Sequence, residues 1–276
     1  MNLEKKSLSI DIEKVLKSKG VNKAPRFLVS FLKRIIHQDE LNELLEQTAG
    51  LEGVDFATKA LEILNITFTL HGEENLPPVG EKFVFASNHP LGGLDGLMLI
   101  SILGKRYDGK VKFVVNDLLM HVTPLEPTFI PINKHGKMSS GYARKIQNAF
   151  DSEAQILYFP AGLCSRLING KIIDLPWKKT FVSKAIESHR GIVPIHFSGK
   201  NSMFFYRLAK LRKFLRIKFN IEMIFLVDEM FKQKNNSFDI YIREPLPADS
   251  LTQEKTYSEW TQIIRNKSYG TDNQSR

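Results

Sequence analysis

The chain has 276 residues, 42% of them hydrophobic and 25% charged, which is the composition of a globular protein long enough to bury a sizeable core. Its single cysteine, Cys164, excludes a disulfide within the chain and fits a reducing compartment, and no stretch reaches the ~18 uninterrupted apolar residues of a membrane-spanning helix. The formal net charge of +9 favours an anionic partner without choosing among nucleic acid, anionic lipid and an acidic substrate.

The first part of the chain predicts helices. Apolar side chains recur at helical spacing in residues 25–35 and 56–64, and two acidic residues, Asp39 and Glu40, mark the start of a further helix between them. We therefore expect residues 1–65 to form an N-terminal helical appendage.

From residue 66 the pattern changes to short apolar runs that alternate with helical segments. Strands are expected at 66–70, 82–86, 112–115, 155–159, 192–197, 221–227 and 238–243, and helices at 94–103, 141–150, 178–188, 204–215 and 258–264. This alternation predicts an α/β fold over residues 66–250, with a mixed, largely parallel central sheet flanked by helices. Residues 251–276 are expected to form a C-terminal helix and, after Lys267, a frayed polar tail.

The segment 88–96 carries the clearest candidate chemistry. His89 follows a predicted buried strand, where ligand sites of open α/β sheets gather, and Asp95 lies where the next helix begins. A histidine can take a proton from a hydroxyl at neutral pH, and a carboxylate can orient its ring and stabilise the imidazolium. A loop histidine beside an N-cap aspartate is the structural alternative, and the flexible Gly92-Gly93 between the two residues moves the balance toward catalysis.

Three later segments also follow predicted strands. Asn133 and Lys134 end an apolar run, where a lysine can meet a phosphate, and Arg166 offers a planar fork for a phosphate or carboxylate. Taken alone, Asn133 and Lys134 are better explained by a solvated turn, and Arg166 could be a surface arginine in a turn. Cys164 has no partner arrangement that would make it a nucleophile, so we treat it as incidental. His196 alternates with apolar residues and is interpreted as a core histidine.

The order of these segments resembles the glycerophospholipid (lysophosphatidic acid-type) acyltransferase superfamily over residues 66–245. That family has an Asn-His motif with a downstream Asp, an apolar segment ending in an anion-binding residue, a Phe-Pro-x-Gly block and a Val-Pro strand. In that order, the matching positions here are Asn88-His89 with Asp95, Ile130-Pro131-Ile132-Asn133-Lys134, Phe159-Pro160-Ala161-Gly162 with Ser165-Arg166, and Val193-Pro194-Ile195. The combination is specific, although no single piece is.

Three departures look like a divergent branch of that family, the hemolysin-related acyltransferases of bacterial aminolipid synthesis. Between His89 and Asp95 stand the five residues Pro90 to Leu94, one more than usual. Ala161 takes the place of the usual Glu, and Asn133-Lys134 replace the usual arginine. These differences bear on the identity of the acceptor more than on the chemistry.

The resemblance implies transfer of a fatty acyl group from acyl carrier protein or coenzyme A to a hydroxyl of a lysolipid or lipid precursor, either a lysophospholipid or a lyso-aminolipid. His89 would be the general base, Asp95 would orient it, and backbone N–H groups of the glycine turn would stabilise the oxyanion. No metal or other cofactor is expected. The expected substrate-binding residues are Asn88, Gly92, Gly93, Asn133, Lys134, Phe159, Pro160, Ala161, Gly162, Ser165 and Arg166.

A membrane surface is the expected place of action, on the inner face of the cytoplasmic membrane, with the protein peripherally attached from the cytoplasm. Residues 204–218 combine an apolar stripe with basic residues and no acidic one, which is typical of an interfacial helix attracted to anionic lipid. An ordinary helix with a core-facing stripe and a solvated basic face is the alternative, and so is a docking surface for an acidic carrier protein.

Three other functions are less consistent with the sequence than acyl transfer. A nucleic-acid partner is not expected, because the basic residues belong to no recognisable binding fold. The histidines lack the spacing of convergent metal ligands, which argues against a metal hydrolase. An inactive lipid-binding or scaffold protein on the same fold is the stronger rival, because Ala161 replaces the usual Glu.

Overall fold

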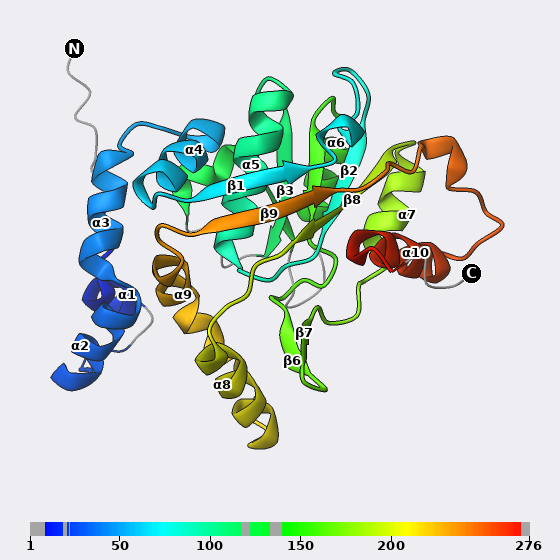
Figure 1. The fold of residues 1–276 in the computed structure, drawn as a ribbon. Helices are drawn as coiled ribbons and strands as arrows, with labels where there is room; N and C mark the ends of the chain where they lie inside the picture. The colour runs from blue at the N-terminus through cyan, green and yellow to red at the C-terminus, as the bar shows by residue number, and fades with distance from the viewer. Residues whose placement is uncertain (1–8, 19–20, 22, 117–121, 133–139, 272–276) are drawn as a thin grey trace, which may run out of the picture.

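The computed structural model describes residues 9–18, 21, 23–116, 122–132 and 140–271. A seven-stranded sheet of order β1-β9-β8-β2-β5-β3-β4 organises the molecule (Figure 1). Its strands are β1 (Thr67–His71), β2 (Phe83–Ser87), β3 (Val111–Asn116), β4 (Phe129–Ile132), β5 (Gln155–Tyr158), β8 (Gly191–Phe197) and β9 (Ser237–Ile242). The neighbours from β8 to β4 run parallel, whereas β9 is antiparallel to β8 and parallel to β1. The predicted mixed, largely parallel sheet is confirmed.

Helices cover both faces of this sheet, and for that reason β2 and β5 are buried at every position. Alternate side chains of β2 enter two separate cores, Phe85 on one face and Val84 on the other. The first core is shared with α4 (Gly53–Ile63) and α5 (Gly93–Arg106), and the second with α6 (Ser140–Asp151), α7 (Thr180–Glu187) and α10 (Tyr257–Tyr269).

The expected N-terminal helices are present, and they divide into two groups. The helices α1 (Ile12–Ser18), α2 (Arg26–Ile35) and α3 (Gln38–Gln47) lie beside the sheet (Figure 1). In contrast, α4 packs directly on α5, where a Cβ at Gly104 would come within 2.2 Å of Val54. The helix α4 therefore belongs to the main body. None of the helices in the described ranges is both long and apolar enough to cross a bilayer.

Two expectations about the second half of the chain were wrong. Residues 221–227 are not a strand: a 3-10 turn, η4 (Ile221–Phe225), leads into α9 (Leu226–Lys232). A short apolar run cannot distinguish a buried strand from a buried helical segment, and here it conceals a buried charge, Glu222. The chain also does not fray directly after Lys267, because α10 continues to Tyr269 and the buried Ser268 donates a hydrogen bond to the Ile195 carbonyl.

Three short strands of the described structure were not predicted: the edge strand β4 and two strands that lie next to the candidate site. The strands β6 (Arg166–Ile168) and β7 (Lys171–Ile173) form a separate antiparallel hairpin. Three-residue strands give too little alternation to be recognised in a sequence. In Figure 1 the hairpin and α8 (Met203–Phe214) project from the same side of the sheet.

Candidate active site

His89 and Asp95 are in direct contact just beyond the carboxyl end of β2. The Nδ1 atom of His89 lies 3.1 Å from each carboxylate oxygen of Asp95. The additional residue between them is accommodated at Gly92, whose φ of +84° belongs to the left-handed region that favours glycine. Because α5 begins at Gly93, Asp95 lies in the first turn of that helix, facing back toward His89.

Asp95 fixes both the orientation and the tautomer of His89. Its carboxylate is completely buried and also accepts hydrogen bonds from the backbone N–H groups of Leu91 and Gly96, each at 3.0 Å. A carboxylate accepts hydrogen bonds but cannot donate one, so the Nδ1 atom of His89 carries a proton. In the neutral imidazole, the lone pair is then on Nε2. No described residue forms a hydrogen bond with Nε2, and the side chain is 15% exposed. This nitrogen is therefore free to act as a base toward a substrate.

Aromatic rings hold the imidazole on its flat side. The ring of Phe159 stacks on that of His89 with 4.1 Å between centroids and 16° between planes. Phe113 in turn meets Phe159 edge-on at 5.3 Å. Phe159, expected to bind substrate, therefore touches the catalytic candidate itself and limits its rotation.

Asn88 acts as a clamp between strands. Its side-chain amide donates to the Phe197 carbonyl at 3.0 Å, and its side-chain oxygen accepts from the Phe197 N–H at 2.7 Å. These bonds join the ends of β2 and β8 and fix the point at which the chain leaves the sheet. The expectation that Asn88 contacts the substrate does not fit this geometry, because its side chain is 3% exposed and bound to backbone.

The block from Phe159 to Ser165 folds against the His89 backbone. Gly162 has a φ of +68° and its N–H donates to the Phe159 carbonyl, while the Pro160 carbonyl accepts from the Lys178 N–H. Ala161 packs in the core on the α7 side of the sheet, and Ser165 donates its N–H to the His89 carbonyl at 2.8 Å. The block thus positions His89, whereas its contact with substrate stays a prediction.

Arg166 is engaged within the protein. Its guanidinium lies 3.0 Å from the carboxylate of Glu222, which is completely buried and also lies 2.8 Å from Nε of Arg212. Arg166 further donates to the Cys164 carbonyl at 2.5 Å. An anion at Arg166 would therefore compete with Glu222, and its role as an anion ligand stays a prediction.

Cys164 and His196 have the properties expected of buried, non-catalytic groups. Burial raises the pKa of the Cys164 thiol to about 12, so the nucleophilic thiolate is absent at neutral pH. Burial likewise lowers the pKa of His196 to about 4, which keeps this ring neutral. Asn133 and Lys134, the predicted anion-binding residues, lie outside the described part of the chain.

Asp174 is a site residue that the sequence did not reveal. Its buried carboxylate accepts hydrogen bonds from the His89 N–H at 3.2 Å, the Ser165 hydroxyl at 2.6 Å and the Trp177 indole at 2.9 Å. Burial raises the pKa of this carboxyl above its ordinary value, against the effect of the three donors. Asp174 follows the short β7 and belongs to no motif, so no local signal could have identified it.

The model of an acyltransferase family matches residues 14–275 of the chain. Two curated relatives are named lyso-glycine lipid O-acyltransferase. The relative from Phocaeicola vulgatus is 49% identical over 263 residues, which cover 94% of each chain. The relative from Bacteroides thetaiotaomicron is 46% identical over 94% of this chain and 96% of its own.

A solved structure provides a comparison of folds. The 1-acyl-sn-glycerophosphate (LPA) acyltransferase of Thermotoga maritima superposes with a TM-score of 0.50, over 95% of this chain and 88% of that one. At 14% sequence identity, this likeness shows a common fold and no more.

Proposed function

The chain belongs to this acyltransferase family and is an O-acyltransferase, and from that premise we propose that it acylates a hydroxyl of a lyso-glycine lipid. Identity of 49% over 94% of both chains supports the same class of acceptor as in the relatives. The observation that carries the mechanism is the contact of 3.1 Å between His89 Nδ1 and the buried Asp95. The contact is also evidence against an inactive scaffold, because folding alone requires no such pair.

In the proposed reaction Nε2 of His89 removes the proton of the acceptor hydroxyl while that oxygen attacks the carbonyl carbon of a fatty acyl thioester. The donor would be acyl carrier protein or coenzyme A. Asp95 stabilises the imidazolium that forms. The first N–H groups of α5 have no backbone partner within the helix; that of Gly96 donates to Asp95, and the others would stabilise the negative charge that develops on the carbonyl oxygen. When the tetrahedral intermediate collapses, the thiolate leaves and takes the proton from His89, so an ester and a free thiol result.

We expect His89→Ala to abolish acyl transfer with little loss of thermal stability, because the ring is partly exposed and its loss leaves only the Asp95 carboxylate short of one donor. Turnover is measured with a lyso-glycine lipid and an acyl thioester, and folding by thermal melting. The matched control is His189→Asn, which removes a histidine that is 79% exposed; asparagine tolerates its left-handed backbone. Wild-type turnover in His89→Ala would remove this residue from the mechanism.

The same proposal places the enzyme on an anionic membrane. The helix α8 packs through Phe205, Tyr206 and Ala209. The predicted stripe is left largely outside, because Phe204, Leu211 and Leu215 are exposed, and the neighbouring Phe214 is 81% exposed. An ordinary helix would turn such a stripe into the core. The helix follows β8, whose end is in register with the end of β2 where His89 lies. We therefore expect its apolar and basic surface to lie at the same end of the strands as His89, where an acyl chain would arrive.

A further inference from the structure

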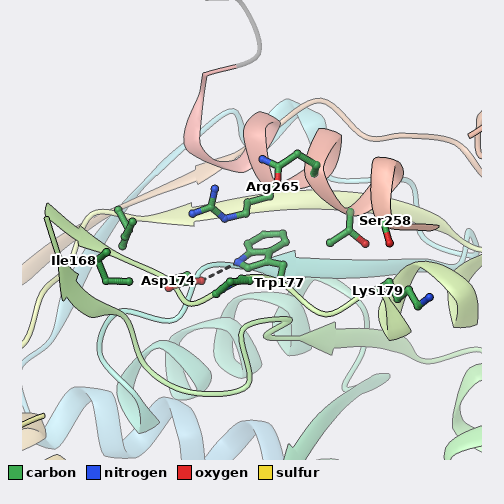
Figure 2. A pocket seen from close by; sticks show the side chains of 10 residues that line it. Ile168, Asp174, Trp177, Lys179, Ser258 and Arg265 are labelled. Carbon is green, nitrogen blue, oxygen red and sulfur yellow. Dashed lines mark hydrogen bonds between the residues drawn. The ribbon is translucent and has the colours of Figure 1, made fainter. Parts of the chain in front are cut away.

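A cavity of about 430 Å³ lies between the loop after β7 and one face of α10. Figure 2 shows the indole of Trp177 in the middle of this cavity, with Asp174 beside it and Arg265 reaching in from α10. The walls are apolar at Ile168 and Trp177, and further polar groups come from α10. The cavity is separate from the contact of His89 with Asp95 and has no part in the chemistry proposed above.

Arg265 is the unusual member of this lining. Its Nε is buried and has no hydrogen-bond partner in the described part of the chain. The guanidinium lies over the Tyr269 ring, 4.9 Å from the centroid, and forms no ion pair with a described residue. Of the five N–H donors of this half-buried guanidinium, Nε–H is the one buried without an acceptor, and burying a donor without an acceptor is costly. The energetic balance would be restored by an anion in the cavity, which planar guanidinium binds with two parallel hydrogen bonds.

The acidic residue of the lining does not fill that role. Asp174 uses its oxygens to accept from His89, Ser165 and Trp177, and it forms no ion pair with Arg265. Lys179, at the rim, adds a second positive charge. The cavity thus joins a cationic group to an apolar wall, which fits an acid attached to an aliphatic chain.

We propose that this cavity binds the carboxylate head group of the lipid acceptor through Arg265. The proposal rests on the function proposed above, because a glycine joined to a lipid through its nitrogen ends in a carboxylate. Asp174 connects the cavity with catalysis: the residue that forms part of its wall also holds the His89 N–H at 3.2 Å. A head group bound here is thereby anchored next to the segment that carries the base.

The test is calorimetric binding of N-octanoylglycine, a soluble carboxylate, with its neutral glycinamide counterpart as the matched ligand. We expect the acid to bind at least about tenfold more tightly than the amide, and Arg265→Gln to weaken the acid about tenfold or more. The matched control is Lys178→Gln, an exposed neighbour outside the lining, which leaves binding unchanged. Equal binding of acid and amide, or wild-type affinity in Arg265→Gln, would overturn the proposal.

A competition experiment distinguishes the acceptor from the other anionic substrate. Coenzyme A carries phosphates, and displacement of N-octanoylglycine by coenzyme A at equal concentration would assign the cavity to the donor and refute the proposal. Failure of coenzyme A to compete supports the acceptor head group.

Kinetics separate this proposal from the proposed function. Arg265→Gln should raise KM for the lipid acceptor about tenfold with kcat nearly unchanged, because Arg265 touches the head group and not the reacting atoms. Acyl transfer to a lyso-glycine lipid with an unaltered KM in Arg265→Gln would sink the site and leave the function standing. If the wild-type protein bound N-octanoylglycine through Arg265 but transferred no acyl group, the proposed function would be refuted and the anion site would stand. His89→Ala should bind N-octanoylglycine as the wild type does.

Discussion

Asp174 connects more of the active site than any residue found from the sequence. It holds the backbone of His89, the hydroxyl of Ser165 and the indole of Trp177 at once, and its own N–H donates to the Tyr269 hydroxyl. These contacts join a strand end, a loop and the last helix. Asp174 is therefore a positioning residue for the proposed base rather than a group that meets the reacting atoms.

Asp174→Asn should lower kcat by about tenfold. The amide nitrogen of Asn would face an N–H or O–H group that now donates a hydrogen bond to the carboxylate, and this repulsion would displace His89. The unpaired donors should also cost about 1–3 kcal/mol of unfolding free energy. Ser165→Ala is the matched variant, since it removes one bond to Asp174 and leaves that of His89 intact. Steady-state kinetics and urea unfolding are measured on both; a kcat loss in Ser165→Ala as large as in Asp174→Asn would contradict the assignment.

His196 makes stability depend on pH with a known sign. Its pKa is lowered from 6.5 to about 4 by burial, so between these values the unfolded chain binds a proton that the native protein refuses. Stability should therefore fall as pH drops from about 6.5 to 4, by about 2–3 kcal/mol. His37 has a raised pKa and acts in the opposite direction, so the measurement compares urea midpoints of the wild type and His196→Gln at pH 7.5 and 5. An identical pH response in both proteins would refute this origin.

The sequence identified the residues whose partners are close along the chain. His89 and Asp95 could be paired from one short segment, and the distance of 3.1 Å agrees with that pairing. The motif shows no protein partner for Asn88 or Arg166, because the Phe197 backbone and Glu222 lie far away in sequence. The structure shows that Asn88 is bound to backbone, whereas the role of Arg166 as an anion ligand stays a prediction. From the sequence alone, a polar side chain in a motif cannot be distinguished from one that is free to bind substrate, because its partner within the protein is visible only in the folded structure.

The prediction of secondary-structure elements is limited in the same way, by contacts that are distant in sequence. The central strands β2 and β5 were predictable because each is a continuous apolar run between turns, as burial on both faces requires. Residues 221–227 have a similar composition but form η4 and the start of α9. The difference lies at Glu222, whose buried carboxylate pairs with Arg166 on the hairpin and Arg212 on α8. The hydrophobic periodicity of residues 221–227 carries no information about these distant ion-pair partners.

Glu222→Ala should destabilise the protein by about 3 kcal/mol, because it leaves the charges of Arg166 and Arg212 without their buried partner. The matched control is Glu62→Ala, which breaks an exposed pair with Lys59 and should cost less than about 1 kcal/mol. Denaturant unfolding of both variants measures the difference. Equal losses would show that the buried cluster contributes no more than a surface ion pair.

For the whole molecule, the exposed apolar side chains of α8 predict attachment to anionic vesicles. The double variant Phe214→Ser/Leu215→Ser should reduce co-flotation with vesicles containing phosphatidylglycerol, and raised salt should weaken binding of the wild type. The control is Val79→Ser, which removes an exposed apolar group before the amino end of β2, whereas α8 follows the carboxyl end of the neighbouring strand β8. Absence of wild-type flotation at moderate salt, or full flotation of the double variant, would exclude α8 as the attachment site.

The helix α10 contributes to the candidate site although it lies far from His89 and Asp95 in the sequence. Chain ends are usually where an enzyme tolerates deletion best. A premature stop codon before Tyr257 would spare His89, Asp95 and every strand of the sheet. It would nevertheless remove Tyr269, the hydrogen-bond partner of the Asp174 backbone, together with one side of the cavity. Selection against nonsense and frameshift mutations should therefore extend at least as far as the codon for Tyr269.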